Sequence, residues 1–237
     1  MGRSIEEYDF QKGEILLFDK ELDWTSFDLV RKLRNFLCRK TGIKKLKVGH
    51  AGTLDPKATG LMIVCTGKET KNIDLIQAKE KEYVATIKLG ATTPSYDLET
   101  EENVAFPTDH INPELLRLAL DKFMGETNQI PPLFSAVKID GKRAYEHARK
   151  GSDIVLQPKK ITISELEVLR FSQTELILRV ICSKGTYIRA LARDLGTELN
   201  SGAYLIGLRR TRIGNFKIED AWNVQSFIEK LSAVETN

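Results

Sequence analysis

The stretch from Gly49 to Gly67 constrains the fold of this chain more than any other. Its second half, Leu61 to Cys65, is a short apolar run with β-branched residues, and this pattern predicts a buried strand. Its first half contains three glycines, which permit backbone angles that other residues avoid. Pro56 also moves Asp55 away from the helical conformation. The sequence therefore predicts a carboxylate on a stiff loop that leads into a core strand.

This carboxylate has two possible uses. An Asp-Pro pair often does no more than start a turn. A rigid loop in front of a core strand is also a place where a protein can fix a reactive group. These residues taken alone leave both interpretations of Asp55 open.

Length and composition place the chain among ordinary globular proteins. Its 237 residues can bury a sizeable core, and 41% are hydrophobic while 29% are charged. There is no apolar run of about 18 residues, so we expect no membrane span. Residues 1–10 are polar and acidic, unlike a signal peptide.

The cysteines favour a reducing, cytoplasmic compartment, and the net charge excludes few classes of partner. Cys38, Cys65 and Cys182 are odd in number, widely spaced and without a C-x-x-C pair, which argues against a disulfide framework and a structural zinc site. Their apolar surroundings predict core positions. The net charge of +3 permits a nucleic-acid partner without requiring one.

The pattern of apolar residues predicts an α+β fold with a mixed, largely antiparallel sheet flanked by helices, because strands and helices do not alternate regularly. Residues 92–107 are polar and aperiodic and predict a loop, and Asp140-Gly141 suits a hairpin turn. The expected strands are 14–18, 61–67, 82–89, 161–171, 175–183 and 204–212. The expected helices begin near Thr25-Ser26, Glu69, Asn112-Pro113, Thr186 and Val224, and we expect Gly125 to end the third.

The motif Gly-His-x-Gly-Thr-Leu-Asp-Pro-x-Ala-x-Gly, which begins at Gly49, resembles the signature of the TruB family of bacterial tRNA pseudouridine-55 synthases. So many constrained positions in one block make the resemblance specific. It implies that Asp55 is the catalytic nucleophile. It also implies the pseudouridine synthase fold, in a single catalytic domain over residues 1–237 with an RNA-binding insertion around residues 125–152.

A second motif runs from Ser183 to Leu191. A strand ends there, Gly185 turns the chain and a helix begins, so Arg189 should lie in the first turn, where it could donate to a carboxylate. Taken alone, Arg189 could pair with Asp194 or face solvent. The motif again resembles the family, in which the arginine pairs with the catalytic aspartate, and this implies the same role for Arg189.

The resemblance also implies roles for residues that carry no clear signal alone. Tyr83 would stack on the target base and is a candidate for proton transfer, although a strand tyrosine could equally belong to the core. His50 would pack beside the flipped nucleotide, although a loop histidine could simply be solvated. The remaining substrate-binding residues implied are Leu208, Lys20, Lys138 and Arg143.

The resemblance extends from residue 13 to residue 216, with departures. Where the family usually has Lys-Pro-x-Gly, this chain has Lys20-Glu21-Leu22-Asp23, and Thr100 replaces a frequent glycine. About twenty residues follow Phe216, too few for the C-terminal PUA domain that many members carry. We therefore expect a short form that binds RNA through its catalytic domain and insertion.

The implied activity is the isomerisation of uridine to pseudouridine in the T-loop of tRNA. No group is added and no redox change occurs, so we expect neither cofactor nor metal. The target uridine must first be flipped out of its stack. The nucleophile could attack C1′ or C6 or assist elimination to a glycal, and the sequence does not choose among these.

The expected partner is the T-arm of tRNA. We expect the protein to be a monomer, and we expect neither a membrane nor an obligatory protein partner. Basic residues in segments 40–47, 138–150 and 209–212 are either solvated or in contact with phosphates, and we expect phosphate contacts. Two other classes remain alternatives. A non-catalytic RNA-binding module would not need Asp55, Tyr83 and Arg189, and a glycoside or nucleoside hydrolase usually needs two carboxylates.

Overall fold

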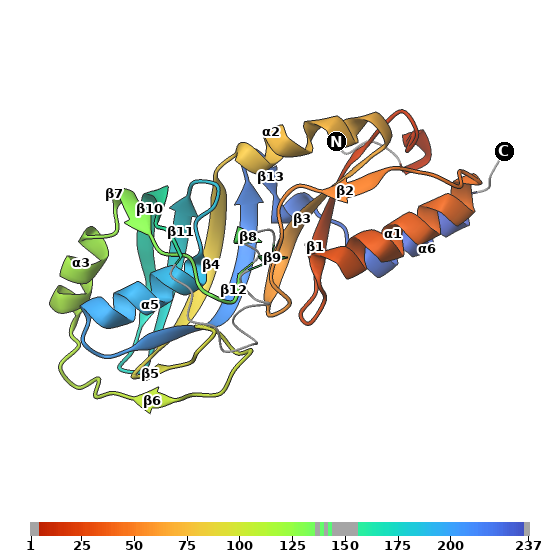
Figure 1. The fold of residues 1–237 in the computed structure, drawn as a ribbon. Coiled ribbons are helices and arrows are strands. Elements are labelled where there is room, and N and C mark those ends of the chain that lie inside the picture. The colour runs from red at the N-terminus through yellow and green to blue at the C-terminus, as the bar shows by residue number, and fades with distance from the viewer. Residues whose placement is uncertain (1–4, 136–137, 140–141, 144–155, 235–237) are drawn as a thin grey trace. The chain divides into compact units, whose positions relative to one another are not determined.

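A computed structural model of the chain describes residues 5–135, 138–139, 142–143 and 156–234, which fold as two compact units (Figure 1). Unit 1 comprises residues 1–81 and 209–237, and unit 2 comprises residues 82–208. No helix within the described ranges combines the length and apolarity needed to cross a lipid bilayer. The strand β12 (Ala203–Ile213) begins in unit 2 and ends in unit 1.

Unit 1 is built on the strands β1 (Ile15–Lys20) and β3 (Ala58–Thr66), which pair antiparallel, with β12 next to β3. Nearly all of β3 is buried, as expected for the strand that follows the Asp55 loop. The smaller elements are β2 (Val48–His50), which pairs with β3, β13 (Phe216–Lys217), which pairs with β12, and the 3-10 helices η1 (Ile5–Glu7), η2 (Gly67–Asn72) and η3 (Ile218–Asp220).

Three α-helices complete unit 1: α1 (Ser26–Thr41), α2 (Ile73–Ala78) and α6 (Val224–Ala233), with α1 and α6 side by side (Figure 1). Thr25 caps α1 in a reciprocal pair with Asp28, so the predicted helix start is confirmed. Gly42 ends α1 in the left-handed conformation that glycine adopts readily.

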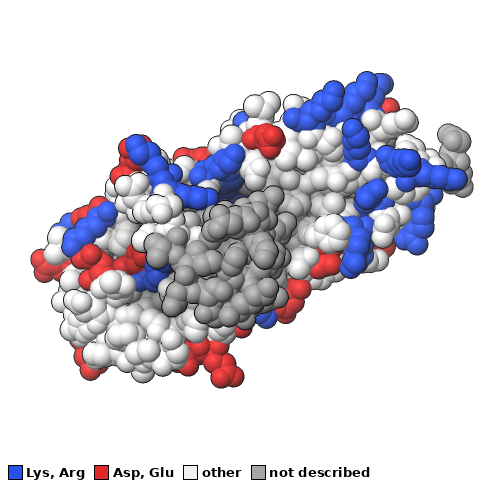
Figure 2. Space-filling model, in the orientation of Figure 1, with Lys and Arg blue, Asp and Glu red and all other residues white. Residues whose placement is uncertain are grey.

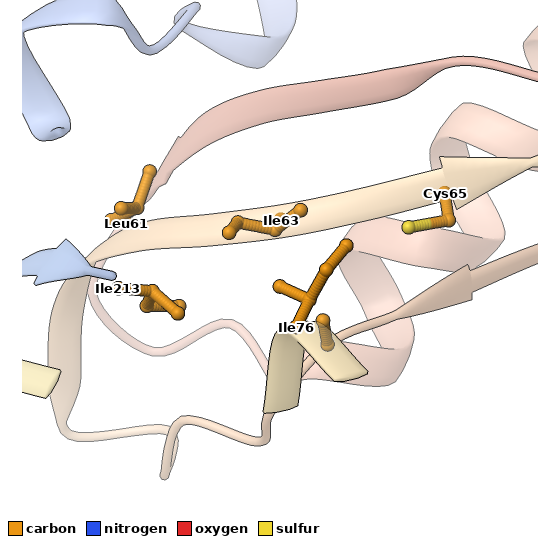
Figure 3. Packing of buried hydrophobic residues seen from close by; sticks show 6 residues of the cluster. Leu61, Ile63, Cys65, Ile76 and Ile213 are labelled. Carbon is orange, nitrogen blue, oxygen red and sulfur yellow. The ribbon is translucent and has the colours of Figure 1, made fainter. Parts of the chain in front are cut away.

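The core of unit 1 lies on one face of β3. Leu61, Ile63 and Cys65 alternate along the strand and share this face, and Ile76 from α2 and Ile213 from β12 point toward them (Figure 3). All five side chains are buried. The Asp55 loop therefore leads into the most firmly packed strand of the unit.

Unit 2 has the strand order β12, β4 (Lys81–Leu89), β11 (Glu175–Cys182), β10 (Lys159–Phe171) and β7 (Gly125–Gln129). The pairs β10–β11 and β10–β7 are antiparallel. Along β4, buried residues alternate with partly exposed ones, so the predicted face of Tyr83, Ala85, Ile87 and Leu89 is confirmed. The short pairs are β5 (Ala91–Thr92) with β6 (Val104–Ala105) and β8 (Lys138–Ile139) with β9 (Lys142–Arg143).

Two helices in contact with each other, α3 (Pro113–Asp121) and α5 (Ile188–Glu198), belong to unit 2 (Figure 1). Asn112 caps α3, and Pro113 occupies its first position, where a missing N–H costs nothing. The α+β class with a mixed, largely antiparallel sheet is confirmed: seven strand pairs of the described residues are antiparallel, and Phe18 forms an isolated parallel bridge with Trp222.

Four local expectations were wrong. The helix expected from Glu69 is a 3-10 helix up to Asn72 and becomes α-helical only at Ile73. The loop 92–107 contains β6 and part of β5, and α3 ends at Asp121, so Gly125 starts a strand instead of ending the helix. Cys38 is partly exposed, whereas Cys65 and Cys182 are buried as expected.

The expected RNA-binding insertion around residues 125–152 is only partly visible. Lys138 lies opposite Arg143 in the β8–β9 pair, in the register of a hairpin, but the Asp140-Gly141 turn lies outside the described residues. All of residues 144–152 lie outside them too. The insertion and the single-domain organisation remain predictions.

Candidate active site

The backbone around Asp55 is held on both sides by hydrogen bonds within unit 1. The Ser26 hydroxyl accepts from the Leu54 N–H at 2.8 Å and donates to the Leu54 carbonyl at 3.0 Å. The Asp23 N–H donates to the Pro56 carbonyl at 2.9 Å, and the Ala58 N–H donates to the Asp55 carbonyl at 3.0 Å. The stiff loop expected from the sequence is therefore tied to the start of α1 and to the segment before it.

Lys20 is fully buried and supports the same loop. Its ammonium group donates to the carbonyl oxygens of Glu21 at 2.8 Å, Trp24 at 2.7 Å and Pro56 at 3.4 Å, which uses all three of its protons. Burial lowers the pKa of Lys20 to about 8, while the negative charge of Asp55 acts in the opposite direction. These contacts indicate that Lys20 supports the Asp55 loop, whereas the sequence led us to expect that it contacts the substrate.

Arg210, which lies in β12, is the second buried cation that supports the Asp55 loop, and 1% of its surface is exposed. Its guanidinium donates to the carbonyl oxygens of Leu61 at 2.8 Å, Gly52 at 3.1 Å and Thr53 at 3.3 Å. The expectation that Arg210 contacts phosphate is therefore wrong. Sequence reasoning missed this anchoring role because a basic run at a strand end gives no signal of burial.

Gly60 is required by the approach of β12 to the start of β3. It has a φ of +105°, and a Cβ atom at this position would lie 2.3 Å from the carbonyl oxygen of Arg210. Two neighbours of Arg210 carry ion pairs: Arg209 donates to both carboxylate oxygens of Asp19, at 2.6 and 3.1 Å, and Arg212 lies 3.1 Å from Glu80. The close packing of Gly60 against the backbone of Arg210 thus fixes the end of the Asp55 loop where β3 begins.

His50 lies in β2 and is partly exposed. Burial and the positive charge of Arg210 lower the pKa of His50, so its ring is neutral at pH 7. Its Nδ1 atom is buried and has no hydrogen-bond partner among the described residues. A neutral ring in this position suits the expected packing beside a nucleotide, which remains a prediction.

Arg189 lies in the first turn of α5 in unit 2, as the sequence predicts. Its guanidinium is 3.4 Å from the Asp97 carboxylate, and both side chains are buried. It also donates to the carbonyl oxygens of Phe134 at 2.9 Å and Ser95 at 3.3 Å. The alternative pairing with Asp194 is wrong, because Asp194 is bonded to Arg193, whereas the pairing with Asp55 remains a prediction.

Sequence reasoning did not identify Asp97, which the structure shows to be a partner of Arg189. A network within the loop fixes its position: the Thr93 hydroxyl donates to the Asp97 carbonyl, and the Glu99 N–H donates to its carboxylate, each at 2.9 Å. The Thr100 hydroxyl accepts from the Ser95 N–H at 3.1 Å. Thr100, noted as a departure from the family pattern, therefore helps to close this loop.

The other candidate residues are distributed as follows. Tyr83 is 9% exposed on the buried face of β4, and Leu208 is partly exposed in β12. Lys138 and Arg143 pair across β8 and β9, and their side chains lie outside the described structure. In the described parts of the chain, no group of three or more His, Cys, Asp and Glu side chains is placed to hold a metal ion.

Comparison with known proteins identifies the family. A family model described as "TruB family pseudouridylate synthase (N terminal domain)" matches residues 39–188. The tRNA pseudouridine synthase B of Phocaeicola vulgatus is 58% identical over 227 residues, which cover 96% of this chain and 97% of the relative. The tRNA pseudouridine synthase B of Parabacteroides distasonis is 60% identical over 211 residues, which cover 89% and 90%.

A solved structure supports the same assignment. The chain matches one in the crystal structure of a Cbf5-Nop10-Gar1 complex with a TM-score of 0.71 and 28% identity. The match covers 96% of this chain but only 56% of that one, so this chain spans about half of its length. From the family match and these long, close similarities, we conclude that this chain belongs to the TruB family of pseudouridylate synthases.

Proposed function

We propose that this protein isomerises uridine 55 in the T-loop of tRNA to pseudouridine, with Asp55 as the nucleophile. The observation that carries the proposal is the rigid Asp55 loop, held by Ser26 and by the two buried cations Lys20 and Arg210. Relatives of nearly equal length named tRNA pseudouridine synthase B support the substrate class.

The reaction breaks the bond between N1 of uracil and C1′ of the ribose and forms a bond between C5 and C1′. The C5 proton leaves and N1 gains a proton, so atoms and electrons balance without a co-reactant. A carboxylate on a fixed loop can serve this exchange as a covalent nucleophile or as a base, because covalent catalysis divides one difficult step into two easier ones. Attack at C1′, attack at C6 and elimination to a glycal remain open.

The roles proposed for the other residues come from the family resemblance. The family resemblance gives Arg189 the role of partner to the Asp55 carboxylate, and this pairing is part of the proposal. Within unit 2, Arg189 is buried and held by Asp97 and two carbonyl oxygens, so its side chain would lose little further entropy in such a pair. His50, neutral at pH 7, would pack against the flipped nucleotide, and Tyr83 would stack on the target base. These roles belong to the proposal.

We further propose that the protein works as a monomer in the cytoplasm and binds the T-arm of tRNA without an obligatory protein partner. Free cysteines at all three cysteine positions suit a reducing compartment. Lys40, Lys44, Lys45 and Lys47 supply charge for phosphate contacts in unit 1. The segment 138–150 would supply further contacts.

The test uses the full chain and an unmodified tRNA transcript. Chemical labelling specific for pseudouridine should find one modified position, 55, and a transcript with cytidine at that position should remain unmodified. Free uracil in the mixture would instead indicate a nucleoside hydrolase. Tight binding with no change in the RNA would indicate a non-catalytic binding module. Either of these outcomes would contradict the proposed function.

A further inference from the structure

We propose that Leu22, Trp24, Phe27, Arg31 and Lys32, together called the 22–32 surface, bind an unpaired nucleotide of the substrate RNA by stacking. This inference rests on the proposed function and adds a second RNA contact beside the Asp55 loop. It concerns side chains of unit 1 to which the catalytic proposal gives no role.

The apolar members of the 22–32 surface contribute little to the core. Phe27 is 67% exposed and Leu22 is 52% exposed. The buried face of α1 is formed by other residues, including Leu29, Leu33 and Leu37, so a polar side chain at position 27 would leave the packing of this helix intact. A group of exposed apolar side chains, in contrast to a single one, indicates contact with a partner.

Cations lie beside both aromatic rings of the 22–32 surface. The Arg31 guanidinium is 6.0 Å from the centre of the Phe27 ring, and the Lys32 ammonium is 4.9 Å from the centre of the Trp24 ring. Arg31 also pairs with Asp28 at 3.1 Å, which holds its side chain near the ring. Aromatic faces beside cations are the combination that binds unpaired nucleotides, because bases stack on the rings while cations attract phosphates.

Two residues adjacent in sequence to members of the 22–32 surface are hydrogen-bonded to the Asp55 loop. Ser26, next to Phe27, bonds both backbone groups of Leu54. Asp23, between Leu22 and Trp24, donates its N–H to the Pro56 carbonyl and accepts from Lys57 at 2.7 Å. A nucleotide on this surface would therefore lie close to a uridine held at Asp55, as a neighbour in the same T-loop would.

The charge around the 22–32 surface favours RNA over an acidic or apolar protein partner. Within α1, Asp28 is the one acidic residue, whereas Arg31, Lys32, Arg34 and Arg39 are basic and exposed. Two exposed acidic residues flank Leu22 before the helix, and both have partners: Glu21 accepts from Asn223, and Asp23 pairs with Lys57. Figure 2 shows Lys and Arg side chains gathered over the part of unit 1 that carries α1 and α2. Neutralisation of phosphates by such residues supplies much of the affinity of nucleic-acid complexes.

The experiment measures binding and kinetics with a T-arm stem-loop RNA. Phe27→Ala should raise the Kd and the KM about tenfold, since base stacking on an aromatic ring has about this effect, while the single-turnover rate at saturating RNA should stay within about twofold. Phe27→Tyr should restore binding. Leu118→Ala is the matched control, because Leu118 is 48% exposed on α3 in unit 2, outside the 22–32 surface, and its loss should change nothing.

Trp24 provides a direct signal. The chain has two tryptophans, so in a Trp222→Phe background the fluorescence comes from Trp24 alone, and added stem-loop RNA should quench it.

Unchanged Kd and KM in Phe27→Ala, or no quenching, would overturn the inference while leaving the proposed function intact. Loss of self-association in Phe27→Ala with normal RNA binding would assign the surface to a second copy and also overturn it. If the parent protein formed no pseudouridine, the proposed function would fail, and Kd and quenching would still test this surface.

Discussion

In unit 1, the guanidinium of Arg210 donates a hydrogen bond of 3.1 Å to the carbonyl oxygen of Gly52, in the loop that carries Asp55. Two further hydrogen bonds from the same group reach Thr53 and Leu61, so one buried side chain ties β12 to the loop and to β3. The loop that carries Asp55, the proposed nucleophile, is thus held by a residue that is far away in the sequence.

Arg210→Met should lower the free energy of unfolding by about 3 kcal/mol, because each buried carbonyl left without a donor costs about 1–3 kcal/mol. The control is Arg209→Met, which removes a half-exposed pair with Asp19 and should cost less than about 1 kcal/mol. Urea unfolding measures both values. Equal effects of the two substitutions would show that the buried contacts of Arg210 do not stabilise the loop.

Gly60→Ala should destabilise the protein by more than about 2 kcal/mol. A positive φ alone costs an L-residue about 1–2 kcal/mol, and the new Cβ would also overlap the Arg210 backbone. Gly42→Ala is the control, since Gly42 has a φ of +72° with open space around it and should show the conformational cost alone. Thermal unfolding of both variants checks the difference, and a milder effect at Gly60 than at Gly42 would refute the close approach.

Lys20 gives the stability of the protein a pH dependence of known sign. Burial lowers its pKa from 10.5 to about 8, so between these values the unfolded chain binds more protons than the folded protein, and stability rises with pH. Relative to Lys20→Met, the parent should gain on the order of 2 kcal/mol from pH 8 to pH 10. Denaturant unfolding at several pH values measures this difference, and a constant or falling difference would contradict the burial of a charged Lys20.

The sequence correctly predicted those helices and strands that are determined by residues close to one another in the chain. The capping of α1 by Thr25 and of α3 by Asn112, and the alternation along β4, depend on residues a few positions apart. The buried strand after Asp55 was predicted from its short apolar run. Each of these patterns decides a structure without help from distant parts of the chain.

The contacts that support the candidate site could not be predicted in this way. Arg210 and Lys20 look like surface cations in the sequence, and only the tertiary fold places carbonyl oxygens around them. Asp97 pairs with Arg189 across a long separation in the chain, so no spacing rule identifies it. The start of α2 was misplaced because the change from 3-10 to α-helix at Ile73 depends on packing, which propensity does not show.

Asp97→Asn should lower both stability and turnover, because it removes the charge opposite the buried Arg189. Breaking a buried ion pair costs about 3–5 kcal/mol, and a displaced Arg189 should slow the single-turnover rate on the order of 100-fold. In the control, Asp194→Asn, the loss of the contact with Arg193 should leave the rate within about twofold. A parental rate in Asp97→Asn would mean that Arg189 needs no positioning by Asp97.

The most direct measurement is pseudouridine formation by Asp55→Asn. Asparagine keeps the size of the side chain and serves a turn nearly as well as aspartate, so the fold and the binding of tRNA should remain. The proposed nucleophile is lost, so we expect no detectable pseudouridine in single-turnover reactions at saturating tRNA. Formation at more than a trace of the parental rate would contradict the assignment of Asp55 as the nucleophile.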